Sequence, residues 1–247
     1  MSPDHFSPVA GPYAAFRPSY PDELFAWLAG IAPQRELAWD CGAGNGQATV
    51  ALAPHFGQVL GTDISAAQLV SAPDLANVEY RVTPAECSGL PSRSVDLVTV
   101  AQAMHWFDLP KFHAEVLRVL KPGGVIAAWG YNRLAIDHPH IQKTLDHFYT
   151  ETIGAYWPPE RAHVENGYRD LDFPYRRIAA PQFSLFKAWT REHLLGYLRS
   201  WSAVGRFRAA HGSDPVDGFA GEIGSHWPEG ETRRVEWPLF LHVGQAI

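Results

Sequence analysis

The stretch Leu37-Ala-Trp-Asp40-Cys-Gly42-Ala-Gly44-Asn-Gly46 decides the fold. Its apolar residues end in an acid and lead directly into three alternating glycines, which predicts a buried parallel strand followed by a tight turn. Residues 47–53 then supply a helix. Glycine suits this turn because it adopts positive φ and allows a ligand to approach the main chain. Amides left unpaired at the first turn of the helix would face that ligand. The stretch therefore predicts a site for a nucleotide-type cofactor.

The glycine spacing discriminates between cofactors. A dinucleotide fingerprint follows G-x-G-x-x-G, whereas the glycines here lie at alternate positions and are followed directly by Gln47. Asp40 would repel a pyrophosphate but attract the ammonium group of a methionine moiety. The D-x-G-x-G-x-G run resembles the first motif of the class I S-adenosylmethionine-dependent methyltransferases. A structural glycine turn in another α/β protein and an NAD-dependent oxidoreductase are the disfavoured alternatives.

Composition places the chain among ordinary globular proteins. Its 247 residues are 46% hydrophobic and 19% charged, which suits one large domain or a domain with an insertion. The net charge of −6 offers no basic face for nucleic acid, so we expect no nucleic-acid partner. Two cysteines, Cys41 and Cys87, cannot form a disulfide framework, which favours a reduced cytoplasmic protein. We see no secretory signal and no apolar run near the ~20 residues that span a bilayer, so we expect no membrane partner. Oligomeric state stays open.

Strand-like and helix-like stretches alternate through the first half of the chain. After the glycine turn, strands are predicted at residues 58–63, 77–82, 94–101 and 125–129. Helical stretches separate them, except that a polar loop at 83–91 precedes the strand at 94–101. Five β-then-α units with short turns imply a doubly wound parallel sheet with right-handed crossovers. A sixth strand at 182–189 and a last, antiparallel strand at 234–243 complete the expected sheet. The predicted fold class is α/β, with a seven-stranded, mostly parallel, Rossmann-like sheet.

Further motifs extend the resemblance over most of the chain, from Tyr13 to about residue 205. They are Tyr13-Ala-Ala-Phe-Arg-Pro-Ser-Tyr-Pro, Gly61-Thr-Asp-Ile-Ser, Gln102-Ala-Met-His-Trp-Phe-Asp and Leu120-Lys-Pro-Gly-Gly. Together they are similar to the "type 11" branch of class I methyltransferases, and within it to the trans-aconitate methyltransferase-like group. The resemblance implies an enzyme that uses S-adenosylmethionine to methylate a small-molecule acceptor.

We expect a single methyltransferase domain over residues 1–247. Its parts would be an N-terminal arm and helix (1–35), a cofactor-binding core (36–131), a lid or substrate insertion after the fifth strand (132–181), and a C-terminal part of the sheet with helices (182–247). The insertion is dense in Tyr, Trp, Phe and Arg. Such a segment suits a lid that builds the substrate pocket.

The cofactor residues follow from the strand ends and from the resemblance. Asp63 closes the second strand, where a carboxylate can accept hydrogen bonds from two ribose hydroxyls. The resemblance implies the other contacts: the methionine part at Asp40, Gly42 and Gly44, with Asn45 in the same loop; the adenine at Ile64, Ala85 and Glu86; the sulfonium side at Gln102; and a covering arm with Tyr13 and Arg17.

His105 is the candidate catalytic residue. It follows the fourth strand in an aromatic loop, where it could act as a substrate-side base or form a wall of the pocket. Trp106 and Phe107 could offer a π face to the sulfonium, an interaction worth ~2 kcal/mol when desolvated, or serve only in packing. The histidines show no cluster with metal-ligand spacing, so no metal is predicted.

The acceptor is the least determined part of the prediction. A carboxylate acceptor would need no base, whereas an alcohol, amine or phenol can require one. If the acceptor is a small polycarboxylate, fork-like recognition would fall to arginines: Arg161, Arg169, Arg176, Arg177 and Arg199. The aromatic content allows a rival apolar or aromatic substrate. A non-catalytic protein that binds S-adenosylmethionine would carry the same cofactor motifs.

Overall fold

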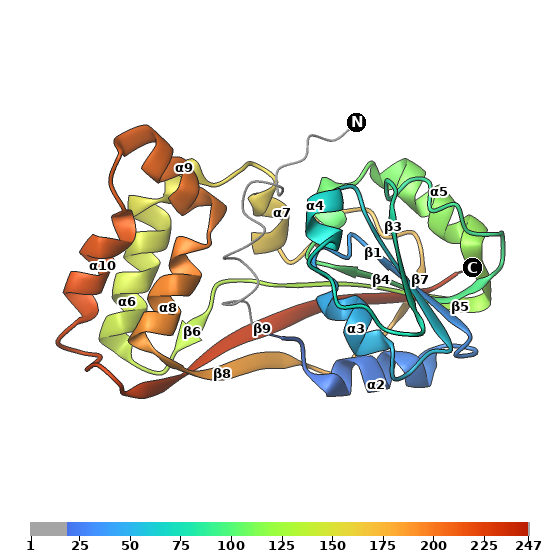
Figure 1. Ribbon diagram of the computed structural model, residues 1–247, viewed down its shortest axis with the longest axis horizontal. Helices are drawn as coiled ribbons and strands as arrows, with labels where there is room; N and C mark the ends of the chain where they lie inside the picture. Colours follow the sequence, from blue (N-terminus) through green and yellow to red (C-terminus); the bar gives the residue numbers. More distant parts are fainter. Residues whose placement is uncertain (1–18, 247) are drawn as a thin grey trace.

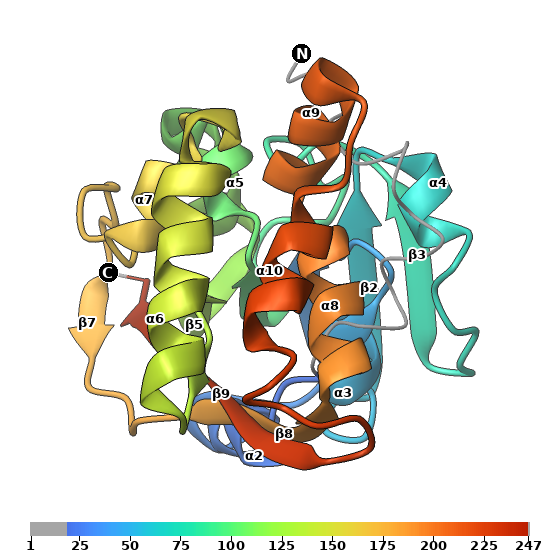
Figure 2. The ribbon, with the colours of Figure 1, turned by 90° about the vertical axis from the view of Figure 1, so that its left-hand side faces the viewer.

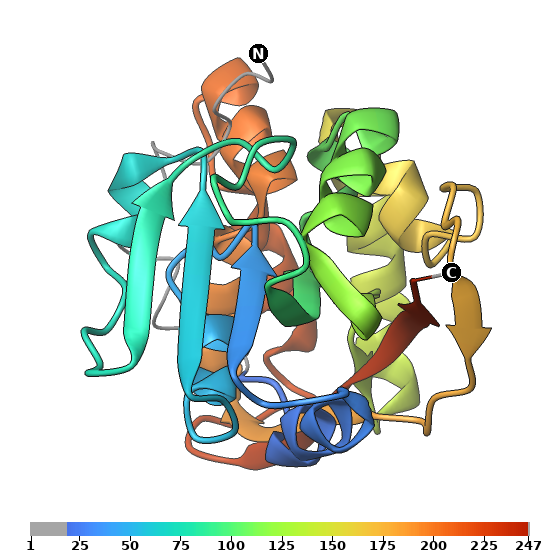
Figure 3. The same ribbon diagram turned by 90° about the vertical axis from the view of Figure 1, so that its right-hand side faces the viewer.

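The parallel part of the sheet forms where apolar strands alternate with helices. The central strand β1 (Leu37–Cys41) pairs in parallel with β2 (Gln58–Asp63) and with β4 (Val95–Ala101). Strand β3 (Val78–Val82) pairs with the outer edge of β2, and β5 (Leu120–Tyr131) with the outer edge of β4. Figure 3 shows that the arrowheads of β1, β2 and β3 end along one edge. The loops that follow these strands therefore meet there.

Helices cover both faces of this sheet because successive strand residues point to opposite sides. On one face, Leu97 and its neighbours pack with α2 (Asp22–Ile31) and α3 (Gln47–Leu52). On the other face, Val98 and its neighbours pack with α5 (Leu109–Val119). The short α4 (Ala66–Leu69) contacts β2 and β3. The predicted α/β, mostly parallel, doubly wound fold is confirmed.

The long strand β9 (Thr232–Gln245) departs from the expected sheet. Its C-terminal half pairs antiparallel with β5 and with β7 (Arg176–Ile178). Its N-terminal half runs on and pairs with β8 (Ser184–Thr190) and β6 (Ala135–Ile136). Over residues 19–246, the part of the chain that the computed structural model describes, the sheet therefore has nine strands rather than seven. The expected sixth strand exists as β8, but it pairs away from the parallel strands.

The overhanging half of β9 carries a lobe of helices (Figures 1 and 2). Three helical segments of the lobe precede α7: α6 (Pro139–His147), the π-helical turn η3 (Phe148–Thr152) and η4 (Gly154–Tyr156). Three more lie near the C-terminus: α8 (Arg191–Arg199), α9 (Ser202–His211) and α10 (Pro215–Ile223). As its position before α8 predicts, Thr190 caps this helix by accepting a hydrogen bond from the backbone amide of His193. The hydrophobic core of the lobe is continuous with that of the sheet.

The residues expected to form a lid, 132–181, are spread over several parts of the molecule. Helix α6 and the turn after it lie in the helical lobe, and β7 lies in the sheet. Helix α7 (Arg161–Glu165) lies between the lobe and the sheet (Figure 1). Within residues 19–246, no helix is long and apolar enough to cross a bilayer.

The junction between β9 and α8 predicts a large effect of one tryptophan. Trp237 is fully buried, its ring lies 4.8 Å from that of Trp189, and its indole N–H donates to the Tyr197 hydroxyl at 3.2 Å. Trp237→Ala should lower the free energy of unfolding by about 3–5 kcal/mol, as measured by urea denaturation. As the control, Phe186→Ala on β8 removes a ring that is 59% exposed and should change it by less than about 0.5 kcal/mol. Equal losses of unfolding free energy in Trp237→Ala and Phe186→Ala would contradict a special role for Trp237 at this junction.

Candidate functional site

The glycine turn lies at the carboxyl edge of the sheet between β1 and α3. Gly42, Gly44 and Gly46 all adopt positive φ, at 73°, 55° and 84°. The backbone amides of Gly42 and Ala43 donate to the carbonyl of Thr62 at 2.8 and 2.9 Å, which holds the turn against the end of β2. A methyl group at Gly42 or Gly46 would collide with neighbouring side chains, whereas one at Gly44 would meet no atom within 4 Å. The turn is therefore packed at its ends and open in the middle.

Asp63 ties the end of β2 to this turn. One carboxylate oxygen accepts from the backbone amide of Gly44 at 2.8 Å, and the other accepts from that of Ser65 at 2.8 Å. Each carboxylate oxygen can accept more than one hydrogen bond, so both remain usable for a ligand's hydroxyls. Ile64 follows with 46% of its surface exposed, an unusual apolar exposure next to a polar site. Asn45 is half-buried in the turn itself.

Asp40 lies beneath the turn rather than at its surface. Its side chain is fully buried, and its two oxygens accept hydrogen bonds from Thr49 of α3 at 2.6 Å and Thr99 of β4 at 2.8 Å. Burial raises the pKa of this carboxyl to about 6, against the lowering effect of the two threonine hydroxyls. Asp40 thus braces α3 and β4 against β1.

Two further loops join the same edge. Ala85 is buried, and Glu86 accepts a hydrogen bond from the backbone amide of Asp108 at 2.9 Å, which links the loop after β3 to the start of α5. At the end of β4, Gln102 has φ of 56°, a strained angle for a residue with a side chain. Its amide nitrogen donates to the carbonyl of Tyr131 at 3.1 Å, and its buried amide oxygen has no hydrogen-bond partner within residues 19–246.

His105 belongs to the short helix η2 (Met104–Trp106) just beyond β4. Its Nδ1 lies 2.7 Å from the hydroxyl of Tyr168, and its ring lies 4.8 Å from that of Trp106. Burial, together with positive charge on Arg161 and His163, lowers the pKa of His105 to about 3. At neutral pH this imidazole is therefore uncharged.

Sequence reasoning missed Tyr168, although its neighbourhood carried a signal. The Asn166-Gly167 pair is typical of a left-handed turn, and Gly167 and Tyr168 both have positive φ, at 62° and 57°. For a buried tyrosine this conformation is costly, so the surrounding structure must hold it in place. Tyr168 also packs edge-on against Phe240 of β9, with the ring centroids 4.9 Å apart.

The structure brings most of the predicted site residues to one edge of the sheet: Asp40, Gly42, Gly44, Asn45, Asp63, Ile64, Ala85, Glu86, Gln102 and His105. Tyr13 and Arg17 lie outside the described residues. Within the part of the chain that is described, no group of three or more His, Cys, Asp or Glu side chains is arranged to hold a metal ion. The fold and the site together define an α/β protein with a nucleotide-type cofactor site at a glycine turn.

Comparison with known proteins identifies the family. Residues 39–128 match a methyltransferase domain. A Dictyostelium discoideum protein described as a methyltransferase is 40% identical over 214 residues, 85% of this chain and 81% of that protein. A methyltransferase-like protein of Schizosaccharomyces pombe is 32% identical over 200 residues, 78% of this chain and 75% of its own length. A solved structure described as a type II methyltransferase from Anaeromyxobacter dehalogenans has a TM-score of 0.88 and 43% identity, covering 94% of this chain and 98% of that one.

The chain belongs to the class I S-adenosylmethionine-dependent methyltransferases. Its cofactor is S-adenosylmethionine, and the alternative of an NAD-dependent oxidoreductase is set aside. The site suits this cofactor because the turn is open at Gly44 and an acid stands beside it at Asp63. When bound, S-adenosylmethionine supplies an electrophilic methyl group on a sulfonium.

Two glycine variants should separate loop stability from cofactor binding. Gly44→Ala and Gly46→Ala both place an alanine at positive φ, at a cost of about 1–2 kcal/mol. The methyl group at position 46 also meets the Tyr80 hydroxyl, so Gly46→Ala should lower the free energy of unfolding more. Gly44→Ala should instead weaken S-adenosylmethionine binding by at least about tenfold, a loss of roughly 1.4 kcal/mol, in calorimetric titrations. Cofactor affinity unchanged in Gly44→Ala would place the cofactor elsewhere.

Proposed function

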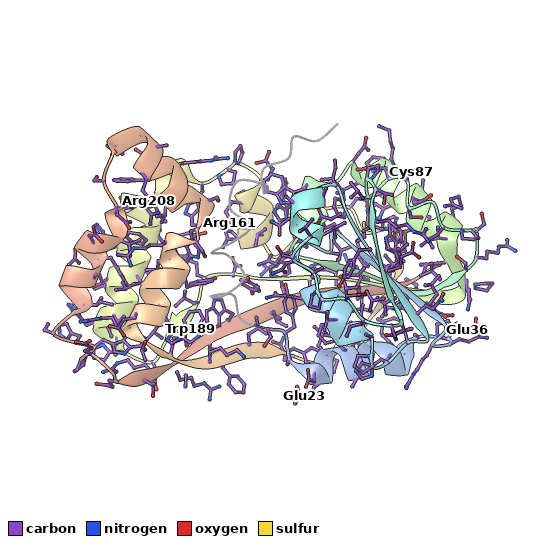
Figure 4. The ribbon with its side chains drawn as sticks, in the orientation of Figure 1. Glu23, Glu36, Cys87, Arg161, Trp189 and Arg208 are labelled. Atoms are coloured by element: carbon purple, nitrogen blue, oxygen red, sulfur yellow. The ribbon has the colours of Figure 1, made fainter. Side chains whose placement is uncertain are left out.

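We propose that this methyltransferase transfers the methyl group to a carboxylate oxygen of a small-molecule acid. The observation that carries the proposal is Arg161, which projects from α7 between the helical lobe and the sheet (Figure 4). Helix α7 contacts η2, which carries His105, and the charge of Arg161 lowers the pKa of His105 and opposes the rise that burial gives to the pKa of Tyr168. An arginine beside the candidate catalytic residue can bind a carboxylate through two parallel hydrogen bonds.

The contacts of Arg161 engage its Nε and one face of its guanidinium, and they leave its two terminal nitrogens available. Its Nε donates to the Tyr149 hydroxyl at 2.9 Å, and its guanidinium lies 5.1 Å from the centre of the Trp157 ring. Glu165 is its nearest acid, at 3.9 Å from the same Nε. Among residues 19–246, neither terminal nitrogen of the guanidinium has a hydrogen-bond acceptor. This orientation supports a role in binding an anion.

The other four candidate arginines have different surroundings. Arg199 forms ion pairs with Asp214 and Asp217, both at 2.8 Å, in the helical lobe. Arg176 donates a hydrogen bond to Gln245, and Arg177 donates one to His242, along the outer edge of the sheet. Arg169 borders an open cavity of about 330 Å³ beside β9. None of these contacts involves η2 or the glycine turn, so Arg161 is the candidate that we retain.

The electrostatics of His105 favour an acceptor that is already ionised. An imidazole whose pKa is about 3 is a weak base, whereas general-base catalysis works best when that pKa lies near the working pH. A carboxylate needs no deprotonation before it attacks a methyl group. The chain's residues would then contribute mainly by aligning the acceptor and excluding water, effects that can supply about 7–11 kcal/mol.

We also propose roles for the residues of the cofactor site. Asp63 would accept hydrogen bonds from the ribose hydroxyls, and the exposed side chain of Ile64 would pack on the adenine. The open middle of the turn at Gly44 would admit the methionine part. Since Asp40 is buried, it would act on the ammonium through the turn and through a charge that is weakly screened in the interior.

Two kinds of acceptor remain to be distinguished: the small polycarboxylate implied by the resemblance to trans-aconitate methyltransferase-like enzymes, and an apolar or aromatic substrate. The resemblance supports a small polycarboxylate, and the rings around Arg161 support an acid with an aromatic or apolar body. Formation of S-adenosylhomocysteine should be measured with polycarboxylic acids, aromatic carboxylic acids and matched phenols. Turnover with an acid and none with the phenols is expected. Turnover with phenols alone would contradict the proposal, and cofactor binding without any turnover would favour the non-catalytic alternative.

Substitution of Arg161 tests the carboxylate contact directly. With a turned-over acid, Arg161→Gln should raise KM by about tenfold or more, as for the loss of a hydrogen bond between charged groups worth about 1.5–3 kcal/mol. Its Kd for S-adenosylmethionine should stay unchanged, because Arg161 is not in the cofactor turn. The matched control Arg169→Gln removes an exposed arginine beside the outer cavity and should leave KM near the wild-type value. A KM shift in the control alone would move the acceptor site there.

A further inference from the structure

We infer that His105 presents an Nε2–H donor to the acceptor's carboxylate, and that Tyr168 fixes this tautomer as a positioning residue. In this arrangement His105 aligns the acceptor and removes no proton from it. The inference rests on the proposed function for the nature of the acceptor. The tautomer itself rests on the geometry of the His105–Tyr168 pair alone.

The hydrogen bond between the two side chains is short and enclosed. His105 Nδ1 and the Tyr168 hydroxyl oxygen are 2.7 Å apart, and Tyr168 is 1% exposed. Tyr168 is held there by its packing on Phe240 and by the left-handed backbone at Gly167 and Tyr168. Such strain in a buried aromatic residue is typical of functional sites. Neither partner can rotate away without losing these contacts.

The single proton of the phenol decides which nitrogen of His105 is protonated. Within residues 19–246, the hydroxyl of Tyr168 hydrogen-bonds only to His105 Nδ1. If Nδ1 carried a proton, it would donate to the hydroxyl oxygen, and the buried phenol proton would have no acceptor among the described residues. A buried donor without an acceptor is strongly disfavoured. The phenol therefore donates to Nδ1, and a neutral ring must carry its proton on Nε2.

The groups facing His105 keep the ring neutral. Arg161 of α7 adds positive charge beside it, and His163 acts in the same direction when it is protonated. Within residues 19–246, the only hydrogen-bond partner of the ring is the phenol of Tyr168, and no carboxylate bonds to it. Nε2 has no hydrogen-bond partner within residues 19–246 and is not fully enclosed, while His105 as a whole is partly buried. Nε2 can therefore form a hydrogen bond with a ligand. Nε2–H and the Arg161 fork are two donors that an acceptor's oxygens can engage.

Methyl transfer in this arrangement would need no proton transfer. With S-adenosylmethionine bound, a carboxylate oxygen of the acceptor would form a bond to the methyl carbon while the carbon–sulfur bond breaks and leaves its electron pair on sulfur. The products would be an ester and a neutral thioether. An alcohol or phenol would leave a proton that neither Nε2–H nor Arg161 can accept. Nε2–H and Arg161 together therefore favour acceptors that are already ionised when they bind.

Nitrogen NMR of the full-length protein labelled with ¹⁵N-histidine tests the tautomer without an acceptor. His105 signals, assigned by their loss in His105→Gln, should show a protonated Nε2 and an unprotonated Nδ1 across pH 5.5–8. Tyr168→Phe removes the phenol and should give a mixture of tautomers. A protonated Nδ1 in the wild type, or a ring that titrates near pH 6.5, would overturn the inference. Since no acceptor is present, this outcome is independent of the proposed function.

Two substitutions of His105 then test the donor in catalysis. Glutamine places an amide N–H near the position of Nε2, whereas asparagine can replace only Nδ1. With a turned-over acid, His105→Asn should lower kcat/KM by at least about tenfold, and His105→Gln should retain most of it. For the wild type, any change of kcat/KM between pH 5.5 and 8, such as protonation of Asp40 with its pKa of about 6 would cause, should persist in His105→Gln. A fall below pH 6.5 that disappears in His105→Gln would identify a base and overturn the inference. If no acid is turned over, the proposed function fails while the NMR result stands.

Discussion

The register of the parallel strands is the constraint on which the site depends. Asp40 of β1 stands opposite Gly61 of β2 and Thr99 of β4, so the three strands finish at one edge. That alignment lets the end of β2 hold the glycine turn and lets the threonines enclose Asp40. A slip of one residue would turn every strand side chain to the other face and separate the turn from its acid. The open middle of the turn, the acid beside it and the loop that carries His105 all follow from this one alignment.

Strand β9 connects the parallel part of the sheet to the helical lobe. Because its C-terminal half pairs with β5 and its N-terminal half with β8 and β6, one strand sets the position of the helical lobe relative to the cofactor edge. The aromatic residues of the lobe form much of the core that continues along this strand, and Phe148, from the segment expected to form a lid, is one of them. Arg161 lies where the two parts meet, so the acceptor site that we propose there would combine residues from both.

The sequence predicted what depends on local pattern and missed what depends on distant contacts. Near-continuous apolar runs located β1, β2, β4 and residues 125–129 of β5, and the glycine spacing located the turn between β1 and α3. The two-residue β6 and three-residue β7 are too short to produce a periodic signal, and their pairing with β9 depends on tertiary packing. His105 and Tyr168 lie 63 residues apart in the chain, so their hydrogen bond could not be read from either segment. The burial of Asp40 likewise depends on threonines from two other elements.

Calorimetric titration of the purified protein with S-adenosylmethionine, S-adenosylhomocysteine and NAD, repeated with Asp63→Ala, tests the central claim most directly. The account predicts binding of the first two ligands and not of NAD, with binding lost in the variant. Asp74→Ala, an exposed acid just beyond α4, should bind like the wild type. Urea denaturation of Asp63→Ala should show a folded protein, which separates lost contacts from lost structure. Undiminished S-adenosylmethionine binding by folded Asp63→Ala would contradict the account, because the cofactor would then lie away from the carboxylate that joins β2 to the glycine turn.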